Sequence, residues 1–123
     1  MNEDALKRCA DEYLGECKEK RTTPQVNELA EKVRLTVSKL SNYFLSVVGM
    51  RPGRYLKREH VLYTIQVIAR TDLDYTTIAR ITGFGSRTTL FRSIRRVTGK
   101  TPDHFRKNKA GKRSRAKTRN RRK

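Results

Sequence analysis

The feature that most constrains this fold is an internal repeat of about 50 residues. An apolar pair, an apolar helix face and a Gly-x-x-Pro-x-x-aromatic motif occur in the same order in both halves of the chain. The matching residues are Leu29-Ala30 with Ile78-Ala79, Leu40 with Leu90, Phe44 with Ile94, Gly49 with Gly99, Pro52 with Pro102 and Tyr55 with Phe105. The first pair is offset by 49 residues and the later ones by 50, which places a one-residue difference in the turn between two helices. Helical solenoids generally need three or more copies, so two copies predict two related subdomains.

Apolar residues recur at helical spacing along most of the chain, and no segment alternates apolar and polar residues for long enough to predict a strand. The chain is therefore predicted to be all-α, with about seven helices. Their expected ranges are about 4–20, 24–33, 37–48, 52–70, 75–82, 87–98 and 102–107. The expected helix starts are the caps Thr36, Asp74 and Ser86 and the first-turn prolines Pro24, Pro52 and Pro102. The apolar positions of the long helix 52–70 are Tyr55, Leu56, Val61, Leu62, Ile65 and Ile68.

The charge is large and unevenly distributed. The 123 residues include 30 Lys or Arg and 12 Asp or Glu, a net charge of +18. Residues 1–31 carry −3, residues 32–107 carry +12 and residues 108–123 carry +9. The last segment has no large apolar side chain, so it is predicted to be a disordered basic tail after a folded domain of residues 4–107. A surplus of this size favours a nucleic acid as partner.

The sequence offers no pattern typical of a catalytic or metal site. Cys9 and Cys17 lie about 12 Å apart along a predicted helix, which is too far for a disulfide, and are expected as reduced thiols in the core. His60 and His104 are isolated, so we expect them to be structural or exposed and expect no metal or cofactor. We expect no enzyme activity. Because no apolar run approaches the roughly 18 residues that a spanning helix needs, we expect a cytoplasmic chain without membrane contact.

Each half of the repeat predicts a helix-turn-helix unit whose second helix has a polar outward face. The outward residues are Ser38, Lys39, Ser41, Asn42 and Ser46 in the first unit and Arg87, Thr88, Phe91, Arg92, Arg95 and Arg96 in the second. Arginine can bridge guanine O6 and N7, asparagine can bridge adenine N6 and N7, and hydroxyl groups can contact bases or phosphates. The helix 52–70 is about 28 Å long, which suits it to join units that enter major-groove segments about 34 Å apart. This pattern predicts binding to double-stranded DNA.

Several segments together carry a family resemblance. They are Leu29-Ala30-Glu31-Lys32-Val33, Leu40-Ser41-Asn42-Tyr43-Phe44, Gly49-Met50-Arg51-Pro52-Gly53-Arg54-Tyr55-Leu56, Asp72-Leu73-Asp74-Tyr75-Thr76-Thr77-Ile78-Ala79, Gly83-Phe84 and Gly99-Lys100-Thr101-Pro102-Asp103-His104-Phe105-Arg106. Over about residues 5–107 the chain resembles the DNA-binding domain of the AraC/XylS family of bacterial transcription regulators. The resemblance implies seven helices, two helix-turn-helix subdomains and binding of an asymmetric DNA site as a monomer.

The resemblance also implies which residues contact DNA. The base-contacting positions would be Ser38, Ser41 and Asn42 in the first recognition helix and Arg87, Thr88, Phe91 and Arg92 in the second. Arg34, Lys39, Arg95 and Arg96 are the phosphate-contact candidates. The chain departs from the family pattern in having Arg34 in place of a turn glycine, Phe91 in place of a small polar residue and Ile94 in place of phenylalanine. Phe91 is expected either to meet a thymine methyl group or to rotate against the domain.

The chain resembles the short, stand-alone members of the family, which implies control by abundance, recruitment of RNA polymerase and a place in the bacterial nucleoid. The function of the whole chain and the role of the basic tail each have an alternative that remains open. A nucleoid-associated or RNA-binding protein would use the charge alone, without a preferred site. The basic tail would add phosphate contacts, bind RNA or another acidic partner, or only keep the chain in solution. The acidic residues Asp11, Glu12, Glu16 and Glu19 are most simply a solvated helix face.

Overall fold

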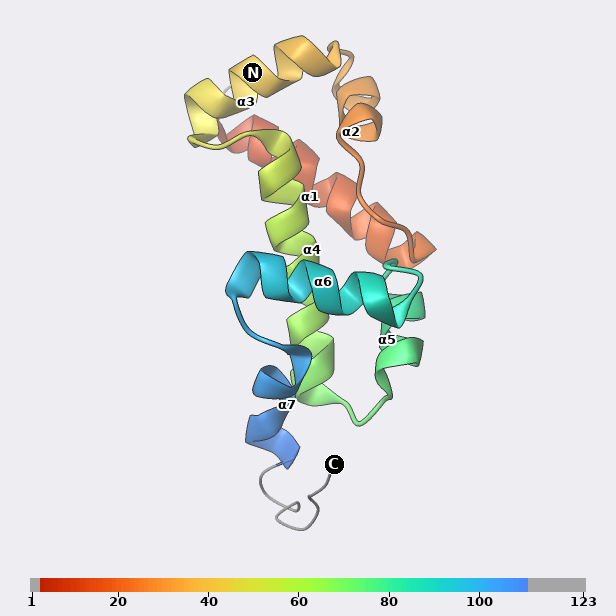
Figure 1. Ribbon diagram of the computed structural model, residues 1–123. Coiled ribbons are helices and arrows are strands. Elements are labelled where there is room, and N and C mark those ends of the chain that lie inside the picture. The colour runs from red at the N-terminus through yellow and green to blue at the C-terminus, as the bar shows by residue number, and fades with distance from the viewer. Residues whose placement is uncertain (1–2, 111–123) are drawn as a thin grey trace.

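The computed structural model describes residues 3–110 as seven α-helices, and that part of the chain contains no strand (Figure 1). The helices are α1 (Glu3–Lys20), α2 (Val26–Val33), α3 (Val37–Val48), α4 (Pro52–Arg70), α5 (Tyr75–Ile81), α6 (Arg87–Thr98) and α7 (Pro102–Ala110). The all-α prediction is confirmed.

Two subdomains lie along α4, as Figure 1 shows. The first core joins α1, α2, α3 and the N-terminal half of α4 around Phe44, Leu29 and Leu40, which are fully buried. The second core joins the C-terminal half of α4 to α5 and α6 around Ile78 and Leu90, with α7 packed on the same half of α4. Each recognition-type unit therefore has its own apolar core, and α4 belongs to both.

The two halves of α4 bury different faces. Tyr55 and Leu56 enter the first core, whereas Val61 and Ile68 enter the second. Leu62, another apolar position of this helix, is 42% exposed. A helix that serves two cores on different sides leaves some apolar positions facing neither of them, so its apolar residues do not form one stripe.

Most predicted helix ends are confirmed. Thr36, Asp74 and Ser86 each accept a hydrogen bond from the backbone N–H three residues later, at 3.1, 2.8 and 3.2 Å. Hydrogen bonding from the Thr77 side chain, and after it from the Thr77 backbone N–H, holds the pKa of the Asp74 carboxyl below its usual value. The start of α2 differs from the prediction, because Gln25 is extended (φ −128°, ψ 137°) and the helix begins only after it, two residues beyond Pro24. The N–H of Gln25 donates instead to the Tyr13 hydroxyl oxygen at 2.8 Å, which holds this connection on α1.

The acidic face of α1 is partly structural. The hydroxyl of Tyr55 donates to Asp11 at 2.8 Å, which links α1 to α4. Lys32 Nζ pairs with Glu16 Oε2 at 2.7 Å, which links α2 to α1. Burial, followed by the Asp11 contact, raises the pKa of Tyr55 well above its usual range. These contacts fix α1 across the first subdomain.

The two subdomains meet where the turn after α5 contacts the segment after α1. Thr23 Oγ1 donates to the Gly83 carbonyl oxygen across this joint.

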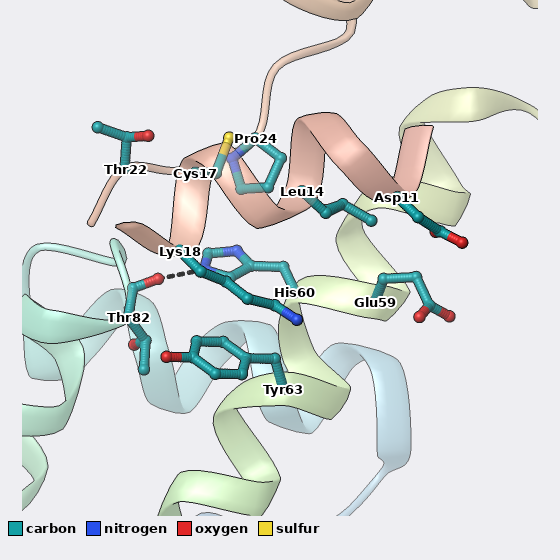
Figure 2. Close-up of a pocket in the computed structure, with 10 residues that line it drawn as sticks. All are labelled: Asp11, Leu14, Cys17, Lys18, Thr22, Pro24, Glu59, His60, Tyr63 and Thr82. Carbon is teal, nitrogen blue, oxygen red and sulfur yellow. Dashed lines mark hydrogen bonds between the residues drawn. The ribbon is translucent and has the colours of Figure 1, made fainter. Parts of the chain in front are cut away.

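His60, on α4, is buried beside the same joint. Its Nε2 donates to the Thr82 carbonyl oxygen at 2.6 Å, and its ring stacks on Phe84 with the centroids 3.9 Å apart. Beside it lies a cavity of about 190 Å³ in which Lys18 extends over the ring of Tyr63 (Figure 2). The joint therefore links α1, α4 and α5.

Other sequence predictions have mixed outcomes. Both cysteines are free; Cys17 is buried in the first core and Cys9 is half-buried. The last helix continues to Ala110, past the predicted domain end at residue 107. Of the predicted tail 108–123, residues 111–123 lie outside the described part of the chain. None of the described helices combines the length and the apolar character that crossing a membrane requires.

Candidate nucleic-acid interface

The helices α3 and α6 are built alike and presented alike. Each follows a polar cap, buries two large apolar side chains and ends at a glycine with positive φ, Gly49 (φ 92°) or Gly99 (φ 78°). Figure 1 shows both helices crossing α4 in the same direction, α3 at its N-terminal end and α6 near its middle. The arrangement leaves one face of each helix outside the two cores.

The predicted residues of α3 lie on or beside this outward face. Ser38, Lys39 and Asn42 are exposed, and Ser41 is half-buried at its edge. Two apolar side chains that sequence reasoning missed share the exposed surface, Val37 (46% exposed) and Leu45 (39%). The available signal was the helical period, which places position 45 away from buried Leu40 and beside Ser38 and Asn42.

The predicted residues of α6 form a basic surface. Arg87, Thr88, Arg92, Arg95 and Arg96 are exposed. Within the described residues, none of these four arginines forms an ion pair with a carboxylate. The exposed side of α6 therefore carries four cations outside any described ion pair, whereas the exposed face of α3 carries one cation, Lys39.

Phe91 packs against its own domain. It is half-buried against the second core and meets Tyr75 edge to face, with the ring centroids 5.1 Å apart. The Arg87 guanidinium lies 5.2 Å from the Phe91 ring centroid and 5.7 Å from that of Tyr75. The Arg106 guanidinium covers the Tyr75 ring at 4.7 Å, and the Tyr75 hydroxyl donates to Asp103. This cluster orients Arg87 at the start of α6 and ties α7 to α5; a contact of Phe91 with a thymine methyl group stays a prediction.

The first turn keeps the left-handed conformation although it lacks a glycine. Arg34 has φ 62° and ψ 41°, and the N–H of Leu35 donates to the Ala30 carbonyl oxygen at 2.9 Å. Arg34 itself is exposed. A non-glycine residue in this conformation costs about 1–2 kcal/mol. The side chain is thus available for a phosphate at some cost to the stability of the turn.

The second turn shows where the extra residue lies. The N–H of Phe84 donates to the Ala79 carbonyl oxygen at 2.9 Å, in the same way that Leu35 donates to Ala30. These pairs keep the 49-residue offset, whereas the caps Thr36 and Ser86 are 50 apart. The inserted residue is therefore Gly85, which has φ 84° and donates to Ala79 as well, at 3.0 Å.

Comparison with known proteins agrees with this architecture. A family model described as a helix-turn-helix domain matches residues 29–108, which run from within α2 into α7. The transcriptional regulator Rv1931c of Mycobacterium tuberculosis is 31% identical over 83 residues, which are 68% of this chain and 32% of that protein. The regulator AlkR of Acinetobacter baylyi is 27% identical over 81 residues, 66% of this chain and 26% of that one. The chain thus spans about a third or less of the length of these curated relatives.

Solved structures share the fold at low sequence identity. The C-terminal domain of AraT, a response regulator from Geobacillus stearothermophilus, superposes with a TM-score of 0.73 at 14% identity, covering 84% of each chain. The DNA-binding domain of AdpA, a global transcriptional factor crystallised with a target DNA, has a TM-score of 0.69 at 23% identity, covering 85% of this chain and 95% of that one. The named relatives are regulators, in agreement with the expectation that this chain is not an enzyme.

Proposed function

The chain belongs to the AraC/XylS family of helix-turn-helix transcription regulators, and from this we propose that it binds one asymmetric DNA site by placing α3 and α6 in successive major-groove segments. The observation that carries the proposal is the pair of equivalent helices crossing α4 in one direction, each with a face left outside the cores (Figure 1). Adjacent major-groove segments on one side of the duplex are about 34 Å apart. One continuous helix, α4, belongs to both units and so holds α3 and α6 at a set separation.

The two helices carry different chemistry, so we expect different base preferences in the two halves of the site. On α3, Asn42 suits contact with adenine, and Ser38 and Ser41 suit contact with bases or phosphates. The exposed side chains of Val37 and Leu45 suit contact with thymine methyl groups.

On α6, arginines suit contact with guanine O6 and N7, and Arg92 lies at the centre of the outward face. Arg95 and Arg96 lie farther along α6 and, with Arg34 and Lys39, are assigned to phosphates. A·T pairs are therefore expected opposite α3 and G·C pairs opposite α6.

The remaining partners follow from this mode of binding. We expect the chain to act as a monomer on DNA in the bacterial cytoplasm, at the nucleoid, with RNA polymerase as its protein partner. The basic residues after 107 are expected to add phosphate contacts without base preference. We expect no cofactor.

The test is selection of bound sequences from random duplex DNA, followed by a footprint of the selected site against excess random DNA. The expected result is one asymmetric footprint of about two helical turns. Arg92→Ala should cost about 1–3 kcal/mol at that site and less on random DNA, and Asn42→Ala should relax preference only in the other half. Protection without a preferred sequence would instead support the alternative of a nucleoid-associated or RNA-binding protein that acts through charge.

A further inference from the structure

A basic groove lies on α4, between the two recognition helices. Its volume is about 490 Å³, and its lining residues are Gly53, Arg54, Lys57, Arg58, Arg96 and Val97. Four of these six residues are cationic, and none carries a carboxylate. Arg54, Lys57 and Arg58 are spaced i, i+3 and i+4, so they lie on one side of the first turns of α4.

The protein supplies little negative charge to this groove. Arg58 pairs with Glu59 at 3.6 Å, a long contact between two partly exposed side chains. Arg54, Lys57 and Arg96 have no ion pair with any described residue. Four cations gathered in one concave surface, with only Arg58 paired and at long distance, raise the local potential and favour an anion. The groove therefore has the chemistry of a phosphate site.

Its position identifies the anion. Arg96 belongs both to the groove and to the exposed side of α6, one helical turn after Arg92, so the groove and the α6 surface are continuous. The other three cations lie on the part of α4 that Figure 1 shows between α6 and α3. A duplex that occupies both recognition helices must carry its sugar-phosphate backbone across this interval.

We propose that Arg54, Lys57, Arg58 and Arg96 bind the phosphates that separate the two major-groove segments. The inference rests on the proposed function and adds a third contact surface to it, supplied by the linker helix. Phosphate contacts fix the position of a protein on the duplex without specifying sequence. This surface should therefore set affinity and salt dependence, while α3 and α6 set base preference.

The experiment compares two triple variants of the full chain on the selected site. In the groove variant, Arg54, Lys57 and Arg58 are each changed to Gln. In the control variant, the exposed residues Arg8, Lys20 and Arg21, which do not line the groove, are changed to Gln, so that both variants lose the same charge. The logarithm of the binding constant is measured against the logarithm of the salt concentration. Each lost phosphate contact should make the slope about 0.9 less negative.

The salt slope of the groove variant should become less negative by about two to three steps of roughly 0.9 each, and that of the control variant by less than one such step. Base preference should be unchanged in both. Equal slopes for the two variants would overturn the proposal, because the effect would then come from net charge. If the groove variant does not fold, Lys57→Gln alone keeps the test available, with an expected change of about one such step.

A change in the DNA gives an independent arm. Duplexes carrying neutral methylphosphonates between the two groove segments should bind the unmodified protein several-fold more weakly, with little further loss in the groove variant. Additive losses from protein and DNA changes would show that these cations do not contact those phosphates. If the unmodified protein has no preferred site at all, the proposed function fails before the groove is tested, so the two failures are distinguishable.

Discussion

The joint between the subdomains gives the sharpest stability prediction. Gly83 and Gly85 lie in the same turn with nearly equal positive φ, 91° and 84°. A Cβ built on Gly83 would lie 2.5 Å from both the carbonyl carbon and the carbonyl oxygen of Thr22, whereas one built on Gly85 would meet nothing within 4 Å. Gly85→Ala therefore tests the backbone conformation alone, and Gly83→Ala tests the conformation plus the close approach of Thr22.

The expected losses of stability follow from the cost of the backbone conformation and the cost of the clash with Thr22. The left-handed conformation costs a non-glycine residue about 1–2 kcal/mol, which applies to both variants. Forcing a methyl group against backbone that cannot rotate away adds about 1–3 kcal/mol for Gly83→Ala. The expected losses are about 1–2 kcal/mol for Gly85→Ala and about 2–5 kcal/mol for Gly83→Ala.

Urea denaturation followed by circular dichroism measures both values, and thermal melting checks them at about 4–8 °C per kcal/mol for a domain of this size. The difference between the two variants is the informative quantity, because the backbone term cancels. A difference below about 0.5 kcal/mol, the usual effect of an unremarkable surface substitution, would refute the tight contact between the two subdomains.

Two further predictions concern single side chains. Burial holds the pKa of His60 below its usual value, so the unfolded chain takes up the proton more readily. The stability that comes from neutral His60 is complete above about pH 6.5 and falls as the pH drops below that value, by at most about 1.4 kcal/mol per pH unit. In urea titrations between pH 5 and 7, His60→Gln should flatten this fall in stability. An unchanged pH profile would assign the fall to other titratable groups. Arg34→Gly should stabilise the first turn by up to about 1 kcal/mol, because glycine adopts the left-handed conformation at no steric cost. The same variant should bind DNA more weakly if Arg34 contacts a phosphate, and a gain or no change in affinity would remove that assignment.

Much of the fold was predictable because its determinants are local. The caps, the glycines after α3 and α6 and the two-fold repeat depend on residues close in sequence, and the structure confirms them. The exposure of Leu62 was not predictable, because it depends on how two cores divide one helix. The approach of Gly83 to Thr22 was missed for a similar reason, since it joins segments 61 residues apart. Such contacts have no signature in a local pattern.

The candidate site divides in the same way. Polar positions on α3 and α6 were predictable from the helical period and the family resemblance. The cations of α4 were passed over because a polar position on a linker helix is usually just solvated. Only the packing of α6 against α4 brings Arg96 beside Arg54, Lys57 and Arg58 and turns separate surface charges into one groove.

The two turns, finally, have different tasks, and the single inserted residue explains why. The first turn ends at a cap directly after Leu35, and its left-handed residue, Arg34, is exposed. In the second turn, Gly85 adds one residue between Phe84 and the cap of α6, and left-handed Gly83 lies against Thr22. The first turn is therefore free to present a cation to DNA, while the second is committed to joining the subdomains. Because α4 is continuous and this joint links it to α1 and α5, the separation of α3 and α6 is built into the fold. In the proposed mode of binding, that separation sets the spacing of the two half-sites.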